Sequence, residues 1–216
     1  MAADQSTGVR THSWWQALVR GSADHADRLI VVSSGRHPDG ARVELDAAAA
    51  RRHAGDDVVC EAVIGTVGVE ALHVSRSFAP RAPDLWFVEL TEPTAQPDAV
   101  NLVAFSGAGQ QPGALLDEDR AAASPVTSGD QLGAIRWYPG TGEVDQVYVA
   151  PAWRRHQVGT ALIGAAGTLS VARGWPRLWG DGQRTADGEG LRNARSWRDR
   201  TADLTHLAPP MTPPTP

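Results

Sequence analysis

The chain contains no lysine, so all twenty of its basic residues are arginine. The absence of lysine excludes Schiff-base chemistry and a lysine nucleophile. It also excludes a Walker-type phosphate loop, because that loop needs a lysine to reach the phosphates.

Cysteine is nearly absent as well. The single Cys60 lies in the apolar stretch VVCEAVIG and allows no internal disulfide, so we expect a small core residue in a reducing compartment. The N-terminal MAADQSTGVR lacks the apolar segment of a signal peptide, and no apolar run approaches the roughly 20 residues that cross a bilayer. These features predict a cytoplasmic protein without a membrane partner.

Several short motifs are missing. No C-x-x-C, H-E-x-x-H or G-x-S-x-G occurs, so no metal site and no serine hydrolase is expected. The fragments GAG (107–109) and GTG (140–142) do not follow a strand and open a helix, which a dinucleotide fingerprint requires.

Negative charge is in excess but unevenly spread. The net charge is −5; residues 1–131 hold 10 arginines and 18 acidic residues, whereas residues 132–216 hold 10 arginines and 7 acidic residues. The overall sign argues against a nucleic-acid partner, while the C-terminal part favours a small anionic ligand.

What is present indicates one packed globule. The chain has 216 residues, 42% hydrophobic content and eight tryptophans, and no internal repeat is apparent. Apolar patterning predicts short helices at 13–21 and 42–55, and strands at 28–34, 57–65, 67–75, 84–90 and 99–107. We divide the chain into a variable N-terminal part (1–107), a long loop or linker (108–131), a core (132–207) and a proline-rich tail (208–216).

The pattern sharpens from residue 131. Strands at 131–138 and 143–149 flank YPGT, which has Pro and Gly at the central positions of a type II turn, so a hairpin is expected. A helix follows, ended by Arg173-Gly174 and Pro176, then a short strand at 177–180 and a helix at 185–197 capped by Thr185. The helix is predicted from one apolar stripe at steps of three and four: Val158, Ala161, Leu162, Ala165, Leu169 and Ala172.

The stretch VAPAWRRHQVGTAL (149–162) joins this strand to this helix. The cluster of Arg154, Arg155 and His156 in this stretch could be a solvated helix start, a nucleic-acid patch or a binding site for a phosphorylated ligand. A helix N-terminus attracts anions, Gly159 allows close approach to the backbone, and Arg154 and Arg155 can donate in pairs to phosphate oxygens. The residues therefore favour a phosphorylated ligand.

The order of elements and the motif R-x-x-x-x-G-x-A-L resemble the GNAT superfamily of acyl-CoA-dependent N-acyltransferases, best over 132–180. Arg154 takes the R/Q place of that family's R/Q-x-x-G-x-G/A loop and Gly159 the last place, whereas Gln157 stands where glycine is usual. The resemblance implies an α/β class fold: an α+β, GNAT-like arrangement with a central mixed, mainly antiparallel sheet flanked by helices. It also implies acetyl-CoA as co-substrate, contacted by Val147, Tyr148, Val149, Arg154, Arg155, His156, Gln157, Val158, Gly159, Thr160 and Ala161.

By the same resemblance, an amine attacks the thioester, a strand N–H at Tyr148 or Val149 stabilises the oxyanion, and a carboxylate accepts the amine proton. Glu143 is the first candidate base and Asp145 the second. The general acid is unassigned, because neither Tyr138 nor Tyr148 lies on the last helix.

Family members usually have two further strands at the end. Here either the N-terminal half closes that side of the sheet, or a second subunit of a homodimer completes the cleft. Two functions therefore stay open: an N-acetyltransferase acting on an amine of a small molecule or peptide, and a non-catalytic acyl-CoA-binding or interaction module.

Overall fold

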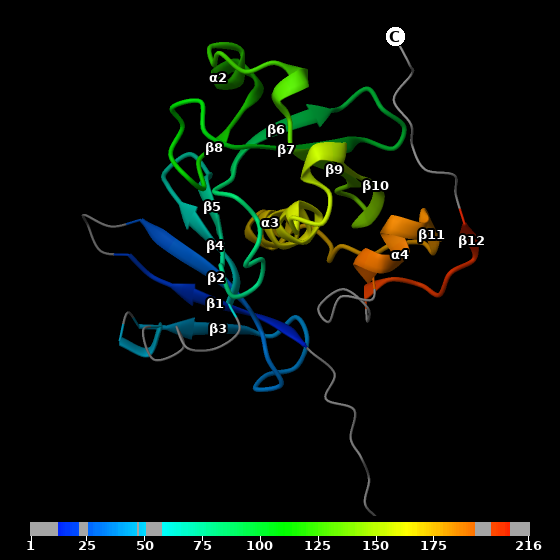
Figure 1. Cartoon of the computed structure of the whole chain (residues 1–216). Coiled ribbons are helices and arrows are strands. Elements are labelled where there is room, and N and C mark those ends of the chain that lie inside the picture. The colour runs from blue at the N-terminus through cyan, green and yellow to red at the C-terminus, as the bar shows by residue number, and fades with distance from the viewer. Residues whose placement is uncertain (1–12, 22–25, 47, 51–57, 193–199, 208–216) are drawn as a thin grey trace, which may run out of the picture.

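A computed structural model describes residues 13–21, 26–46, 48–50, 58–192 and 200–207. Two five-stranded mixed sheets enclose one long helix, which Figure 1 shows almost end-on between them. The fold is therefore a mixed α/β arrangement with few helices, compatible with the expected α+β class. The expected single central sheet flanked by helices is wrong, because the long helix lies between two sheets and contacts both.

Sheet A is built from the first half of the chain. Only β1 and β3 run parallel; all other neighbours in this sheet are antiparallel. Its spatial order is β3 (Arg42–Leu45), β1 (Trp14–Val19), β2 (Asp27–Ser33), β4 (Val58–Ile64) and β5 (Val69–Val74).

Sheet B follows in the chain. Here only β6 and β8 run parallel. Its spatial order is β10 (Glu143–Val149), β9 (Gly133–Tyr138), β7 (Ala99–Phe105), β6 (Trp86–Glu92) and β8 (Leu115–Leu116). One antiparallel bridge, between Ala71 and Ala114, joins β5 of sheet A to β8 of sheet B.

The two sheets repeat one topology, although no repeat is apparent in the sequence. Each sheet has an antiparallel hairpin, a third strand parallel to the first, and two further antiparallel strands on the other side. A helical segment follows each third strand and packs on the outer sheet face: residues 48–50 through Ala50 on sheet A, and α2 (Glu118–Ala122) through Ala121 on sheet B. Residues 14–74 and 86–149 are thus two copies of one ββ-β-α-ββ unit.

Helix α3 (Val158–Ala172) is the centre of the core. It contacts strands of both sheets, and eleven of its fifteen residues are buried, so it is apolar on every side and not only along the predicted stripe. Small residues let the sheets approach: a Cβ at Gly164 would lie 2.8 Å from the Phe78 ring. Cys60 packs in this core as expected, and burial raises the pKa of its thiol to about 12.

One predicted helix is wrong, and another is helical only at residues 48–50 of its described part. Residues 14–19 form strand β1, because Trp14 faces the central core while Trp15 packs in the outer core of sheet A, an alternation with period two. Residues 42–45 form β3 beside β1, and the remainder of the predicted helix is described only at 46 and 48–50. The predicted strands at 28–34, 57–65, 67–75, 84–90 and 99–107 are confirmed as β2, β4, β5, β6 and β7.

Two smaller expectations change, and one is confirmed. The stretch 108–131, expected as a loop or linker, carries β8 and α2 and belongs to sheet B. Residues 177–180 form no strand of their own but bridge Glu143 at Trp179 and Thr201 at Gly180. Beyond them, α4 (Ala186–Arg192) is capped by Thr185 as predicted, and β11 (Gln183–Arg184) pairs with β12 (His206–Leu207).

Candidate functional site

The hairpin β9–β10 leads into the candidate site. Both Thr141 and Gly142 donate backbone N–H groups to the carbonyl of Tyr138, at 3.1 and 2.7 Å. The positive φ lies at Gly142 (φ 78) and not at Gly140, so the expected type II turn is wrong. Glycine is required at 142 because a Cβ there would lie 2.2 Å from the Arg177 carbonyl oxygen.

Strand β10 forms the edge of sheet B beside this hairpin. Val144, Val147 and Val149 pack against the core, and the register shifts between Val144 and Gln146. The strand therefore carries an irregularity at Asp145, near its beginning.

The backbone of β10 presents alternate amides to its open edge. Ala150 donates to the Leu132 carbonyl of the neighbouring chain segment at 2.9 Å, so the N–H of Tyr148 also points toward β9. The N–H groups of Val147 and Val149 consequently point away from β9. Of the two expected oxyanion donors, the geometry favours Val149 over Tyr148 and adds Val147.

The turn between β10 and α3 has an unusual backbone. A short 3₁₀ turn, Pro151–Trp153, precedes two residues with positive φ, Arg155 (φ 65) and Gln157 (φ 60). The left-handed conformation of Gln157 explains why glycine suits this place. Its side chain points to the other repeat, because Gln157 Oε1 accepts a hydrogen bond from the Arg81 N–H at 2.8 Å.

The N-terminus of α3 lacks a cap. Gln157 gives no side-chain cap, and within the described part of the chain no acceptor meets the N–H groups of Val158, Gly159 or Thr160. Val158 and Gly159 are buried, so these donors are not simply hydrated. Unpaired donors at a helix start, together with the helix dipole, favour an anion.

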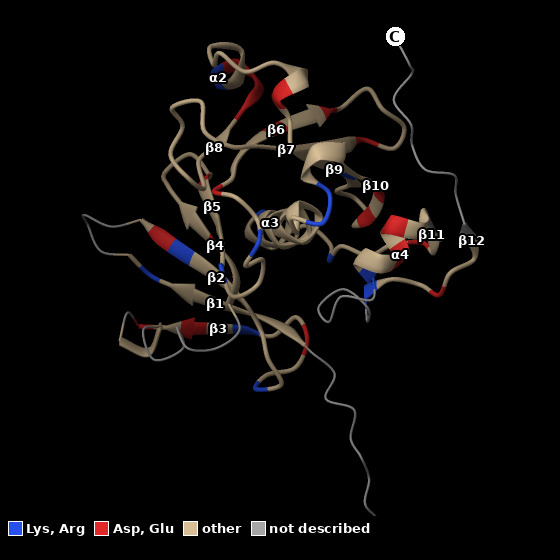
Figure 2. Ribbon diagram, in the orientation of Figure 1, with Lys and Arg blue, Asp and Glu red and all other residues tan. Residues whose placement is uncertain are grey.

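Helix α4 faces the same place. Arg155 Nη2 lies 3.2 Å from Asp187 Oδ1 and Arg154 Nη1 lies 3.8 Å from Asp187 Oδ2, so one carboxylate is shared by both arginines and a net positive charge remains. Arg154 also donates from Nε to the Val149 carbonyl at 3.4 Å. A Cβ at Gly159 would lie 3.4 Å from Leu191, so α4 covers the glycine that was expected to admit a ligand. Figure 2 shows the basic stretch on the loop that enters α3.

His156 lies outside this arrangement. Its side chain is exposed, its Nδ1 lies 2.9 Å from the Arg154 carbonyl oxygen, and its ring meets Trp153 edge-on at 5.7 Å. These contacts shape the loop. Of the expected acetyl-CoA contacts, Thr160 and Ala161 follow later in the chain, in the first turn of α3.

The two candidate bases lie on the outer face of sheet B. Asp145 pairs with Arg136 at 2.6 Å and accepts a hydrogen bond from the Tyr138 hydroxyl at 3.0 Å. Hydrogen bonds to Glu92 and then Asp145 raise the pKa of Arg136, and the Arg136 hydrogen bond lowers the pKa of Glu92. Glu143 is half-buried, and its carboxylate meets no partner within the described residues. Glu143 is therefore the freer of the two carboxylates.

Sequence reasoning missed Asp187, Leu191 and the contact between Arg81 and Gln157. No local spacing connects these residues, because Asp187 lies 32 residues after Arg155 and Arg81 lies 76 residues before Gln157. The one available signal is the pair of acidic residues, Asp187 and Glu189, in the first turn of the helix predicted at 185–197.

The replacement Gln157→Gly should leave acyl-CoA binding unchanged or improve it. Glycine removes the left-handed strain, about 1 kcal/mol, while the lost hydrogen bond from exposed Arg81 costs about 0.5–1 kcal/mol. The free energy of unfolding, measured by urea denaturation, should therefore change little. Gln157→Ala is the matched control. It loses the hydrogen bond without relieving the backbone strain, so it should destabilise the folded protein. A severe loss of binding in both variants would mean that the Gln157 side chain contacts the ligand.

Comparisons with known proteins find no relative of this chain. Among the described residues, no group of three or more His, Cys, Asp or Glu side chains could hold a metal ion, and none of the described helices is long and apolar enough to cross a membrane. No protein-family model, no curated protein and no solved structure matches the sequence.

Proposed function

We propose that the protein is an acyl-CoA-dependent N-acyltransferase of GNAT type, which transfers an acetyl group from acetyl-CoA to an amine. The observation that carries the proposal is the buried, uncapped start of α3, whose three N–H groups lack acceptors in the described structure and lie next to Arg154 and Arg155. A pyrophosphate supplies the acceptors that this helix end lacks. It would take the place of the Asp187 carboxylate opposite the two arginines.

The open edge of β10 supports the same proposal. The C-terminal segment meets β10 at its beginning, where Val144 donates to the Trp179 carbonyl at 2.8 Å. Beyond that point Gly180 pairs with Thr201, and no described residue accepts a hydrogen bond from the N–H of Val147 or Val149. A pantetheine arm carries amides, and an exposed strand edge binds amides.

The reaction needs a base near an oxyanion donor. The amine nitrogen forms a bond to the thioester carbon, its proton passes to a carboxylate through water, and the C–S bond breaks to release a thiolate that solvent protonates. With a rise of about 3.3 Å per residue, Val149 is roughly 20 Å from Glu143 along the strand and Val147 is roughly 13 Å. A base at Glu143 is therefore nearer to the N–H of Val147, and the proton must reach it through a chain of waters, because roughly 13 Å exceeds the span of a single water.

A non-catalytic acyl-CoA-binding module is the second candidate. It is favoured by the pairing of Asp145 with Arg136 and by the positions of both tyrosines, Tyr138 on β9 and Tyr148 on β10, neither of which is on α4. Both candidates use the same ligand site. Release of free thiol from acetyl-CoA in the presence of a panel of amines distinguishes them, because only the enzyme produces it.

Acetyl-CoA should raise the thermal midpoint of unfolding. A ligand at 100 times its dissociation constant stabilises the native state by about 2.7 kcal/mol, which for a chain of this size raises the midpoint by about 5–10 °C. Differential scanning fluorimetry with acetyl-CoA measures this shift, and pantetheine, which lacks the pyrophosphate, is the control that should act weakly. An unmoved midpoint at millimolar acetyl-CoA would refute both candidate functions.

A further inference from the structure

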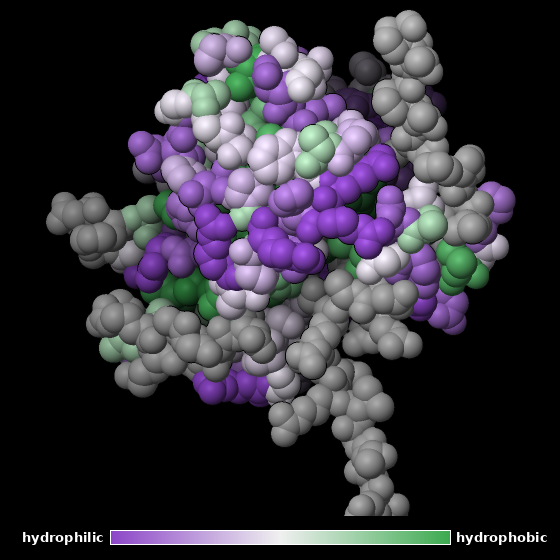
Figure 3. Space-filling model, in the orientation of Figure 1, coloured by the Kyte–Doolittle hydropathy of each residue, from purple (hydrophilic) through white to green (hydrophobic). Residues whose placement is uncertain are grey.

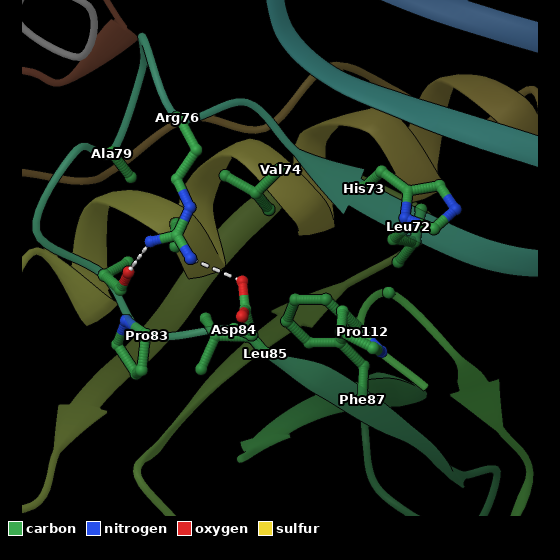
Figure 4. A pocket seen from close by; sticks show the side chains of 13 residues that line it. Leu72, His73, Val74, Arg76, Ala79, Pro83, Asp84, Leu85, Phe87 and Pro112 are labelled. Carbon is green, nitrogen blue, oxygen red and sulfur yellow. Dashed lines mark hydrogen bonds and ion pairs between the residues drawn. The ribbon is translucent and has the colours of Figure 1, made fainter. Parts of the chain in front are cut away.

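A cavity lies at the seam where the two repeats meet. Leu72 of β5 donates its N–H to the Gly113 carbonyl at 2.7 Å, and beside this contact lies a space of about 210 Å³ (Figure 4). The space reaches α3 at Ala161. Its lining comes from β5, the loop 75–85, β6 and the turn before β8, and includes Leu72, Val74, Ala79, Leu85, Phe87 and Pro112.

This seam repeats the backbone of the β10–α3 junction. Ser75 donates to the Val59 carbonyl at 3.0 Å, as Ala150 donates to that of Leu132 at 2.9 Å. Three residues further on, Phe78 donates to the Ser75 carbonyl at 3.1 Å, as Trp153 donates to that of Ala150 at 2.8 Å. Val74 of the first repeat is therefore the counterpart of Val149 in the second, and both end an edge strand in the same way.

The backbone of Val74 is unpaired. Because Ser75 donates toward β4, and strand groups alternate, the N–H and the carbonyl of Val74 point away from β4 and toward the cavity that Val74 lines. No hydrogen bond reaches either group from any described residue. A donor and an acceptor on one residue, a few ångströms apart, match the two complementary groups of an amide.

The charged groups at the rim neutralise one another. Arg76 donates to the Ala82 carbonyl at 2.5 Å and pairs with Asp84, as the dashed lines in Figure 4 show. His73, at the other end of the cavity in that figure, lies over Gly113, where a Cβ would meet its ring at 2.2 Å. The rest of the wall is apolar, so the cavity offers no net charge to an occupant. Hydrophilic side chains cover much of the face seen in Figure 3, in contrast to this lining.

We propose that this cavity binds a compact, neutral molecule that carries an amide and one apolar side chain. The amide pairs with the N–H and carbonyl of Val74 as a one-residue added strand, and the side chain fills the apolar space beside Phe87 and Ala161. The cavity is smaller than the roughly 300–1,000 Å³ of sites for drug-sized ligands, so one amino-acid-sized unit fits. The inference does not depend on acyl transfer, although the cavity borders Ala161, one of the expected acetyl-CoA contacts.

The probe is N-acetyl-leucinamide, titrated into the full-length protein while amide resonances are followed by NMR. Saturable shifts are expected at Val74, Leu85 and Ala161. The ester analogue, in which oxygen replaces the N–H of the acetamide group, should bind about three- to tenfold more weakly, because this N–H no longer donates to the Val74 carbonyl. N-acetyl-leucine, a carboxylate, and leucinamide, a cation, should both bind more weakly than the neutral probe.

Substitution at Val74 tests the backbone itself. Val74→Pro removes an N–H that no strand uses, whereas Val74→Ala keeps the N–H and shortens the side chain. Binding should fall about tenfold in the proline variant and stay within about threefold in the alanine variant. Each of three results would overturn the proposal, even if the proline variant fails to fold. They are the absence of a saturable shift with wild-type protein, equal binding of the ester and the amide, and tighter binding of either charged probe.

Discussion

Replacing Glu143 by Gln is expected to lower the acyl-transfer rate by roughly 10²- to 10⁴-fold while acetyl-CoA affinity stays unchanged. Glutamine keeps the size and most hydrogen bonds of glutamate but accepts no proton at neutral pH. Glu143 lies where β10 meets Trp179, and its carboxylate has no partner within the described chain. The loss should shrink at high pH, because more of the amine is then already neutral. Steady-state rates from thiol release, measured between neutral pH and pH 10, check both statements.

Asp145→Asn is the matched control on the same strand. Asp145 already pairs with Arg136 and Tyr138, so its removal should disturb the outer face of sheet B with a small effect on rate. A larger loss for Asp145→Asn than for Glu143→Gln would transfer the role of base to Asp145. Full activity in both variants would show that neither carboxylate accepts the proton.

The double replacement Arg154→Ala, Arg155→Ala should weaken acetyl-CoA binding about 100-fold, or about 2.7 kcal/mol. Each guanidinium donates charge-assisted hydrogen bonds to phosphate oxygens, although the exposure of Arg155, 85% of its side chain, limits its share. The part of the affinity that the arginines supply should fall with ionic strength, because exposed charges are screened. Titration calorimetry at two salt concentrations measures it.

Asp187→Asn should act in the opposite direction. The carboxylate competes with phosphate for Arg154 and Arg155, so its neutralisation should tighten acetyl-CoA binding about three- to tenfold.

For the double arginine variant, Arg173→Ala is the control for the loss of an arginine elsewhere. Arg173 pairs with Glu89 and stacks on Trp175 at the far end of α3. Unchanged affinity in the double arginine variant would mean that the pair is only a solvated surface.

Strands were predicted well and the first helices badly, for one physical reason. Strands β2, β4, β6 and β7 read as short β-branched runs bounded by turn residues. Segment 14–19 has apolar residues on both faces, because sheet A has cores on both sides, and a run without alternation does not distinguish strand from helix. The duplication stayed hidden because it is a repeat of topology, formed by hydrogen bonds between distant strands.

The candidate site was predictable as far as it is local. The strand, turn and helix over 143–172 lie where the patterning placed them, and Arg154, Gln157 and Gly159 follow in one short loop. Contacts from distant segments were not predictable, since they depend on how α4 and the loop at Arg81 pack against this turn. The direction of each strand amide also needed the register, which a sequence does not contain.

The central position of α3 has a consequence for folding. The helix follows both repeats in the chain, yet its residues fill the space between the two sheets. During synthesis, a chain that ends before residue 158 therefore exposes the inner apolar faces of every strand in the two sheets except β3, and neither repeat has a complete interior of its own. Most stabilising contacts then join segments far apart in the sequence, which is typical of slow folding. The two repeats should consequently unfold together, as one cooperative unit, and neither should persist once α3 is removed.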